Sequence, residues 1–244
     1  MTKMPELERV HRALARAGVA SRRAAERMVA EGRVSVNGES ARVGQKIAPG
    51  DVLEVDGRPV TAERPAVFLV NKKRGVISTA ADPQGRPTVV DELPIGLRLY
   101  PVGRLDRDTT GALLVTNDGE LAHRLMHPRH GMTKEYEVLV KGRVSEAVVR
   151  RLRRGVELED GVTRPAGVER MSRRAPACTW LRFRLSEGRN RQIRRMGEAV
   201  GHPVIRLHRP AYAGLDVGTL EPGAWRELAS EEVGQLASTV GLAR

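Results

Sequence analysis

The sequence has one cysteine, few aromatic residues and no long hydrophobic run. Its single cysteine, Cys178, cannot form an intramolecular disulfide and cannot supply a multi-cysteine zinc site. No stretch approaches the roughly 18 consecutive apolar residues that a membrane-spanning helix needs, and the first residues lack the apolar core of a secretory signal peptide. We therefore expect a protein of the cytoplasm that has no disulfides and no cysteine-based metal centre.

What the chain does contain is positive charge. Lysine plus arginine number 42, against 30 for aspartate plus glutamate, which gives a formal net charge of +12. The 244 residues, 40% of them hydrophobic, are enough for one sizeable core and a small appended module. Such an excess of positive charge indicates a polyanionic partner, and nucleic acid is the first candidate.

The N-terminal part of the chain has the pattern of a small helical and stranded module. Apolar residues at helical spacing predict helices over 6–17 and 22–31, and Ser21 fits the N-cap of the second helix. Short strands are predicted over 33–36 and 51–55, because each run is followed by a turn-forming Asn-Gly or Asp-Gly pair. A strand-turn unit should therefore close the module.

The module carries exposed positive charge and ends at a short linker. Arg22 and Arg23 lie at the start of the second predicted helix, where they are placed to contact phosphates. A solvated basic face explains the same charges equally well. Because residues 61–66 are polar, contain a proline and separate two apolar patterns, we predict a module over 1–60, a linker over 61–66 and a larger domain over 67–244.

The larger domain mixes strand and helix patterns without an internal repeat. Predicted strands cover 67–70, 98–102, 111–116, 134–142, 156–158, 179–185 and 201–210. Predicted helices cover 120–126, 145–155, a run within 186–201, and a short C-terminal helix capped at Ser230.

A polar loop between two of these strands is the first candidate for chemistry. It runs from Gly103 to Gly111 and contains two acids: Asp106, which lies between Arg104 and Arg107, and Asp108, which follows Arg107. Loops held between buried strands often carry functional residues. A surface turn in which Asp108 and Thr109 make local hydrogen bonds accounts for the same sequence. The loop alone therefore leaves its two acids on an equal footing.

The run 186–201 is the second candidate. At 100° per residue, Arg191, Arg194 and Arg195 fall on one helix face, opposite an apolar face. Arginines at a helix start oppose the macrodipole, at a cost of a few tenths of a kcal/mol each, on the order of helix-end charge effects. That cost indicates an anionic partner, either a phosphate or a carboxylate.

Two further groups of residues each allow more than one interpretation. His123, His127 and His130 invite a metal site, but Pro128 breaks the helix and no glutamate stands between the first two in the metalloprotease arrangement. Tyr136 lies in an alternating strand, where it is either a core aromatic or a ring on which a base can stack. We predict no metal site and leave both roles of Tyr136 open.

Several motifs together resemble known families. The amino-acid sequence over 14–23 and 32–38 resembles that of the alpha-L RNA-binding module of the ribosomal protein S-four type. Gly103-Arg104-Leu105-Asp106, then Lys134-Glu135-Tyr136, then the run 187–196 occur in the order of the RsuA/RluB pseudouridine synthases of bacterial ribosomal RNA, which the chain resembles over nearly its whole length. The motifs 125–128 and 206–209 look closest to the RluB branch, which modifies large-subunit RNA.

The resemblance implies a fold and a set of roles. The fold is α+β, with the small module followed by a catalytic domain on a mixed, mainly antiparallel sheet that holds a central cleft. Asp106 would be the catalytic aspartate, Tyr136 the ring that stacks on the target uracil, and Arg194 the partner that keeps Asp106 ionised. The implied RNA-binding residues are Arg22, Arg23, Arg104, Arg189, Arg191 and Arg195, of which Arg189, Arg191 and Arg195 also compete with Arg194 for the contact to Asp106.

The implied reaction converts a uridine of ribosomal RNA to pseudouridine, without redox change and therefore without a cofactor. The implied partner is ribosomal RNA, including that of an assembling large subunit, and we expect a monomer. A second hypothesis is a non-catalytic RNA-binding or ribosome-assembly factor, which the positive charge alone would also support. A third, a metal-dependent nuclease using His123 and His127, is disfavoured by the ligand spacing.

Overall fold

The computed structural model describes residues 7–93 and 96–242. The chain divides after Ala66 into two compact units, and residues 96–98 and 117–119 group with the first. Each unit is described here by itself. Within the described ranges, no helix has both the length and the hydropathy needed to cross a membrane.

The first unit packs two helices against short strands. Helix α1 spans Val10–Arg16 and α2 spans Arg22–Ala30. The hydroxyl of Ser21 accepts a hydrogen bond from the Ala24 amide at 3.2 Å, which confirms Ser21 as the N-cap of α2. The strands are β1 (Glu8–Arg9), β2 (Val34–Val36), β3 (Glu39–Ser40), β4 (Lys46–Ile47), β5 (Leu53–Val55) and β6 (Arg58–Pro59).

Two tight hairpins shape the four-stranded sheet of this unit, whose order is β3-β2-β5-β6. The hairpins turn at Asn37-Gly38 and Asp56-Gly57, and all four residues have positive φ, between 49° and 81°. Paired positive φ values define the two-residue turn that matches strand twist. The strands and turns predicted from the sequence are therefore confirmed, although each strand is shorter than its pattern.

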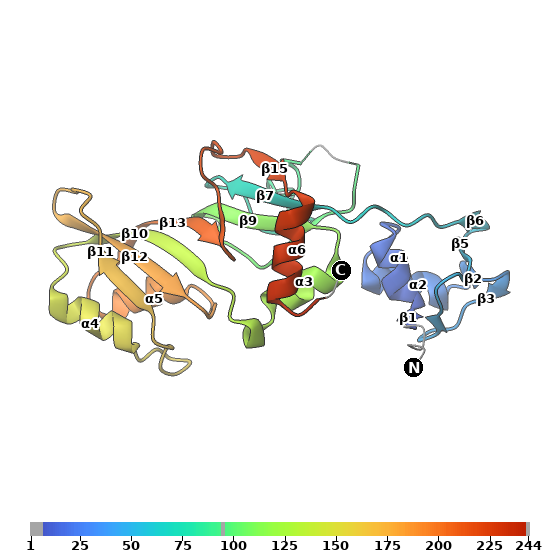
Figure 1. Ribbon diagram of the computed structural model, residues 1–244, viewed down its shortest axis with the longest axis horizontal. Coiled ribbons are helices and arrows are strands. Elements are labelled where there is room, and N and C mark those ends of the chain that lie inside the picture. Colours follow the sequence, from blue (N-terminus) through green and yellow to red (C-terminus); the bar gives the residue numbers. More distant parts are fainter. Residues whose placement is uncertain (1–6, 94–95, 243–244) are drawn as a thin grey trace. The chain divides into compact units, whose positions relative to one another are not determined.

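The second unit is built on one large mixed sheet (Figure 1). Among the described residues the sheet has nine strands, in the order β11-β12-β10-β13-β9-β7-β15, with β14 beside β13 and β8 beside β9. The strands are β7 (Val67–Lys72), β8 (Tyr100–Pro101), β9 (Thr110–Thr116), β10 (Lys134–Lys141), β11 (Gly167–Arg170), β12 (Cys178–Leu185), β13 (Val204–Tyr212), β14 (Leu215–Asp216) and β15 (Trp225–Glu227). All printed pairings of this sheet are antiparallel except one, as the fold class predicted.

The exception is the parallel pair β9–β13 in the middle of the sheet, where Gly111 lies opposite Arg209. Gly111 has φ +109°, and a Cβ added there would lie 2.1 Å from the Arg209 carbonyl oxygen. Only glycine permits this approach of the two backbones. The central junction of the sheet therefore depends on one residue without a side chain.

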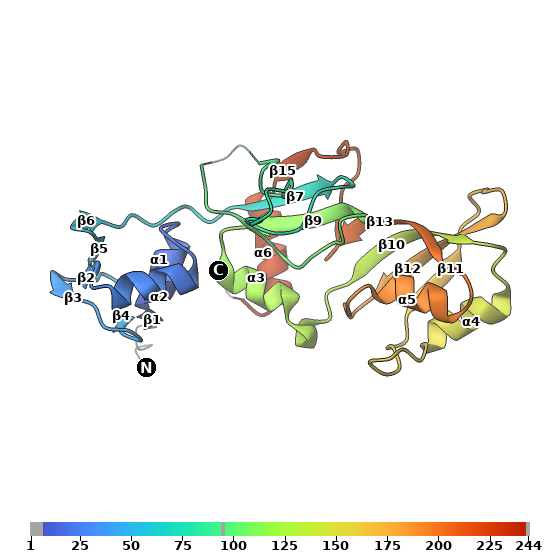
Figure 2. The ribbon, with the colours of Figure 1, turned by 180° about the vertical axis from the view of Figure 1, so that it is seen from behind.

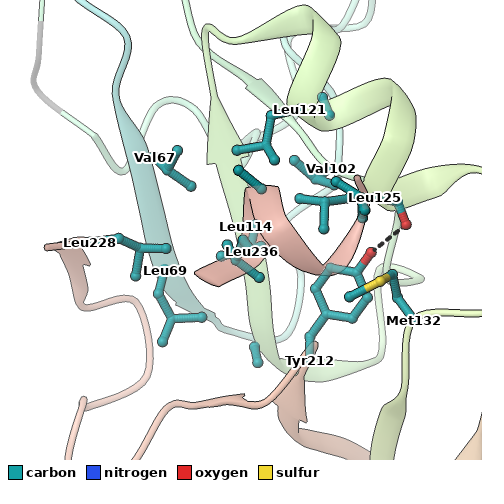
Figure 3. Close-up of a cluster of buried hydrophobic side chains, with 14 of the residues drawn as sticks. Val67, Leu69, Val102, Leu114, Leu121, Leu125, Met132, Tyr212, Leu228 and Leu236 are labelled. Carbon is teal, nitrogen blue, oxygen red and sulfur yellow. Dashed lines mark hydrogen bonds between the residues drawn. The ribbon is translucent and has the colours of Figure 1, made fainter. Parts of the chain in front are cut away.

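Helices cover the two halves of the sheet separately, as the front and rear views show (Figures 1 and 2). Helices α3 (Gly119–Met126) and α6 (Ser230–Thr239) pack on β7 and β9, and their apolar side chains form one core cluster (Figure 3). Helices α4 (Glu146–Arg154) and α5 (Gln192–Ala199) pack on β10 and β12 around a second cluster. The candidate site lies between these two clusters, beside strands β10 and β13.

Four local predictions differ from the structure. The helix predicted over 6–17 begins only at Val10, because Glu8 and Arg9 form strand β1, which pairs with β4. Residues 156–158 form no strand, because Val156 exchanges hydrogen bonds with the backbone and hydroxyl of Thr163 and closes a loop. Helix α6 begins at Ser230 with Ala229 at the cap position, where its amide donates to Glu232 Oε2 at 2.9 Å. The strand expected over 98–102 is reduced to Tyr100–Pro101.

Candidate active site

A cleft of about 790 Å³ opens in the second unit. It is bordered by the loop that carries Asp106, by the segment after α3 and by the residues that lead into α5, and strands β10 and β13 contribute Tyr136 and Arg209. This size suits one nucleoside or a comparable ligand. The structure thus brings the expected aspartate, the expected tyrosine and Arg191 to one cavity.

Hydrogen bonds from Lys72 hold the loop that carries Asp106 in place. The Lys72 ammonium, fully buried, donates to the carbonyl oxygens of Thr109 at 2.8 Å and of Asp106 and Lys73 at 3.1 Å each. Burial lowers the pKa of Lys72 from 10.5 to about 8. Since three carbonyl acceptors match the three donors of an ammonium, the charged form is the one that fits.

Ser78 and Gly75 complete the support of this loop. The Ser78 hydroxyl donates to the Leu105 carbonyl at 2.8 Å and accepts from the Leu105 amide at 3.1 Å. The Gly75 amide donates to the Arg107 carbonyl at 2.8 Å. The main chain on both sides of Asp106 is therefore fixed, while the Asp106 side chain remains 34% exposed in the cleft.

The charge partners of the two loop acids differ from the expected arrangement. Arg194 lies 2.7 Å from Asp108, whereas Asp106 lies 3.6 Å from Arg191. The expected pairing of Arg194 with Asp106 is thus wrong for this structure, and Asp108 is more than a turn residue. Arg194 is also buried on α5, with a side chain 8% exposed, rather than part of an exposed cationic face.

The reason lies in the position of α5. Its third residue, Arg194, enters the space between the helix and the loop, where a carboxylate partner offsets the cost of burying the guanidinium. Asp108 is that partner, and the Nε atom of Arg194 remains buried without a hydrogen bond. Arg191 has φ +47° just before the helix, and its side chain is 48% exposed.

Arg189 and Arg195 use their donors within the protein. Arg189 donates to the Gly161 and Val162 carbonyls at 2.8 and 2.6 Å, and Arg195 holds both carboxylate oxygens of Asp160 at 2.8 and 3.1 Å. The Arg195 guanidinium lowers the pKa of Asp160. Both arginines fasten the loop 160–162 to the start of α5, so the carboxylate alternative for the anionic partner applies to Arg195.

The other predicted RNA-binding residues are exposed. Arg104 is exposed and lines the cleft. Arg22 and Arg23 are exposed at the start of α2 in the first unit. Their placement leaves them available to a polyanion.

Tyr136 is half-buried in the cleft beside two residues of β13. Arg209, only 3% exposed, donates to the Tyr136 hydroxyl at 3.5 Å and lies 4.8 Å from the centre of the Tyr212 ring. Lys134 donates to the Met132 carbonyl at 3.0 Å, and burial lowers its pKa to about 8. Tyr136 is therefore accessible to a ligand. It lies beside Lys134, Arg209 and Tyr212, which together form the floor of the cleft.

The histidines show no metal arrangement. Within the described ranges, no group of three or more histidine, cysteine, aspartate or glutamate side chains could hold a metal ion. His127 accepts a hydrogen bond from the Arg129 amide at 3.2 Å, and His130 contacts the Arg129 guanidinium at 2.8 Å. These contacts organise the turn Pro128–His130 at the rim of the cleft.

Sequence reasoning missed Lys72 and Arg209 as parts of the site. Lys72 lies two residues beyond the strand predicted over 67–70, but it is the last residue of β7. Arg209 lies within the strand predicted over 201–210, which by itself gave it no role in the site. A signal was present in strand alternation, because Arg209 shares a face with the buried Leu207, not with the exposed Arg206.

The chain matches two family models and close relatives over most of its length. The model described as RNA pseudouridylate synthase matches residues 66–199, and the S4 domain model matches residues 8–53. The ribosomal large subunit pseudouridine synthase B of Bacillus subtilis is 46% identical over 233 residues, which cover 94% of this chain and 96% of that protein. An uncharacterized RNA pseudouridine synthase of Aquifex aeolicus is 43% identical and covers 96% of this chain and 95% of its own length.

A solved structure agrees with these matches. A crystal structure of a pseudouridylate synthase superposes with a TM-score of 0.67 at 29% identity, over 93% of this chain and 99% of the other. The resemblance and the α+β fold with an N-terminal module, both expected from the sequence, are confirmed.

Proposed function

Since the chain belongs to the RNA pseudouridylate synthase family and carries an N-terminal S4 domain, we propose that it converts a specific uridine of large-subunit ribosomal RNA to pseudouridine. The observation that carries this proposal is the cleft, where Asp106 and Tyr136 meet on a cationic floor. The relatives named as large-subunit synthases support the choice of RNA.

The reaction breaks the bond from ribose C1′ to N1 of the base, turns the ring and joins C1′ to C5. The proton on C5 is lost and N1 gains one, so no atom is exchanged with a cosubstrate and the balance requires no cofactor. The target nucleotide must first leave its stack, at a cost of a few kcal/mol. Such a site therefore needs an aromatic ring that stacks on the extruded base and a carboxylate close to it.

We assign the catalytic carboxylate to Asp106 and the stacking ring to Tyr136. Asp106 is the loop acid with a side chain in the cleft, and its contact to the exposed Arg191 is long, at 3.6 Å. Arg194 acts on the same loop indirectly, through its 2.7 Å ion pair with Asp108. Arg194 is therefore a positioning residue in this proposal.

RNA binding is assigned to both units. Arg104 lies at the cleft, and Arg22 and Arg23 lie on α2 of the S4 domain, where phosphate contacts are independent of sequence. Arg191 is exposed enough to contact RNA, whereas Arg189 and Arg195 stabilise the loop 160–162. We further propose that the protein acts as a cytoplasmic monomer, on free ribosomal RNA or on an assembling large subunit.

The test is Asp106→Asn, assayed by base-resolved pseudouridine mapping of ribosomal RNA incubated with the purified protein. The expected loss of turnover is on the order of 10³-fold or more, because the amide can neither attack nor accept a proton. Asp108→Asn is the matched comparator, which removes the same charge two residues away and should slow turnover without abolishing it. Wild-type turnover by the Asp106 variant would refute the assignment.

The non-catalytic alternative is not favoured, because the family and the close relatives are enzymes. It predicts that ribosomal phenotypes survive the loss of Asp106. Pseudouridine mapping of ribosomal RNA from cells that carry only the Asp106→Asn protein separates the two hypotheses. If the protein is an enzyme that uses Asp106, one uridine that is modified in wild-type cells stays unmodified in these cells.

A further inference from the structure

Arg209 is a buried cation without an anionic partner. Its Nε atom donates to the Ala112 carbonyl at 2.7 Å and its Nη1 atom to the Tyr136 hydroxyl at 3.5 Å, while Nη2 is buried with no hydrogen-bond partner. In the described part of the chain, no carboxylate forms an ion pair with it. The side chain is 3% exposed and lines the cleft.

Such a group costs folding free energy. An uncompensated charge moved out of water is destabilising even after the surroundings relax. Two aromatic rings offset part of this, with the guanidinium carbon 4.8 Å from the Tyr212 ring centre and 5.9 Å from the Tyr136 ring centre. Arg194, the other buried arginine of this region, has Asp108, so the lack of a carboxylate at Arg209 is specific.

Two lysines near Arg209 carry further positive charge. The Lys134 ammonium lies 5.8 Å from the centre of the Tyr212 ring, and Lys72 holds the loop above. Burial lowers the pKa of both lysines, and the charge of Arg209 acts in the same direction, while Glu92, Asp108 and Asp106 at Lys72 and Glu187 at Lys134 act in the opposite direction. Arg209 is therefore a preformed cation at the cleft that has no carboxylate of its own.

The proposed reaction supplies a negative charge. When the C1′–N1 bond breaks, its electron pair stays on the pyrimidine, and the negative charge spreads over N1 and the two carbonyl oxygens. If Asp106 instead adds to the base first, the electrons move to the same carbonyl system. Each route therefore makes the ring transiently anionic, and the ring lies on Tyr136, directly beside Arg209, if Tyr136 is the stacking residue.

We propose that Arg209 is the fixed cation that stabilises the negative charge on the pyrimidine while it is detached from, or loosened on, its ribose. The inference rests on the proposed function and extends it to a residue outside the three motifs. A cation fixed in a low-dielectric site needs no reorganisation when the charge develops, which is the condition under which electrostatic stabilisation is largest. The unpaired Nη2 atom and the absent carboxylate are then features of the catalytic design.

The first experiment compares Arg209→Met with Arg206→Met. Arg206 is exposed on the same strand, so its variant removes the same charge from the surface and serves as the control. The measurement is the single-turnover rate of pseudouridine formation, with enzyme in excess over a transcript of large-subunit ribosomal RNA. We expect Arg209→Met to be slower by about 10²-fold or more, as for removal of an oxyanion donor, with RNA affinity equal to that of Arg206→Met.

The second experiment distinguishes charge from shape. An amine introduced by Arg209→Lys would lie among Lys72, Lys134, Tyr136 and Tyr212, in the burial that already lowers the pKa of Lys134 to about 8. Its rate relative to wild type should therefore fall as pH rises from 6 to 9, because the amine loses its charge and arginine does not. Taking the ratio cancels the titration of Lys72 and Lys134, which both proteins share.

Each outcome decides the inference. A slow Arg209→Met protein with a pH-dependent Arg209→Lys ratio supports it, and the ratio alone decides if thermal unfolding shows that Arg209→Met does not fold. An Arg209→Met rate equal to that of Arg206→Met, or a ratio that is flat with pH, overturns it while leaving the proposed function intact. A wild-type protein that forms no pseudouridine in ribosomal RNA overturns the proposed function, and the inference with it.

Discussion

Replacement of Lys72 by methionine should separate the stability of the protein from the geometry of its catalytic loop. The ammonium of Lys72 connects β7 to three carbonyl oxygens, two of which, those of Asp106 and Thr109, belong to the loop. Methionine has a similar length and no donor. The substitution therefore removes the attachment of the loop and leaves the buried strand in place.

The loss of stability should be small because two effects oppose each other. Three hydrogen bonds from a charged donor contribute about 1.5 kcal/mol each at the lower end. Against this, a pKa lowered from 10.5 to about 8 corresponds to a burial penalty of about 3 kcal/mol on the ammonium at neutral pH, and the substitution removes that penalty. We expect Lys72→Met to lose about 1–2 kcal/mol of folding free energy.

The loss of turnover should be much larger. Without the ammonium, the Asp106 main chain is free to shift, and a displacement of about 1 Å at a reacting group costs on the order of 10²-fold in rate. The assays are urea denaturation and single-turnover pseudouridine formation, with Lys141→Met as the control because its side chain is exposed at the end of β10. A variant with wild-type rate would refute the attachment as a catalytic requirement.

Comparing the pH dependence of the wild-type protein with that of Lys72→Met gives an independent check on Lys72, because Lys134, whose pKa is also lowered to about 8, titrates in both proteins. The pKa of the buried amine is depressed, so between about 8 and 10.5 the unfolded chain holds more protons than the folded chain, and stability from this group rises with pH. Turnover should fall over the lower part of the same window, because the neutral amine has only two donors for three carbonyls. Opposite trends in stability and rate are therefore expected above pH 8.

Two further predictions concern the sheet and the C-terminal helix. Gly111→Ala should cost on the order of 3 kcal/mol or more in urea denaturation, because φ is +109° and the new Cβ would meet the Arg209 carbonyl. Gly234→Ala, at an exposed position of helix α6 with no atom near the new Cβ, should be neutral or stabilising by up to about 1 kcal/mol. The Arg226 guanidinium, 2.7 Å from both Glu232 oxygens, lowers the pKa of that carboxyl to about 2, so its stabilisation is complete above pH 4.5 and is lost as pH falls toward 2; Glu232→Gln should flatten thermal stability over that window.

The elements of the fold were largely predictable because local rules decide them. Ser21 caps its helix as predicted, Ser145 does so at the start of α4, and the Asn37-Gly38 and Asp56-Gly57 pairs form the turns of hairpins. The strand predicted over 156–158 was wrong, because three residues of apolar alternation are too few to distinguish a strand from a loop that Thr163 closes. Which strands would pair in parallel was not predictable from local pattern at all.

The identity of the site was predictable from motifs, but its ion pairs were not. Asp106 and Asp108 are two residues apart, and Arg191 and Arg194 are three apart, so spacing permits either pairing. The choice depends on how deeply α5 packs: Arg194 faces inward, where it meets Asp108, and Arg191 remains at the surface near Asp106. How deeply a helix packs depends on tertiary contacts, so it cannot be predicted from the positions of residues around the helix axis.

The two residues that sequence reasoning missed share a physical explanation. Lys72 donates to acceptors 34 and 37 residues away, and Arg209 donates to acceptors 97 and 73 residues away. Charge patterning assigns lysine and arginine to the surface, because burial of a cation is costly and rare. A sequence in which a basic residue takes an inward position of a buried strand breaks that pattern, and the folding cost is tolerated where function uses the charge. Inward-facing cations of central strands, rather than exposed basic runs, are therefore the residues to examine first when the floor of such a cleft is sought from sequence.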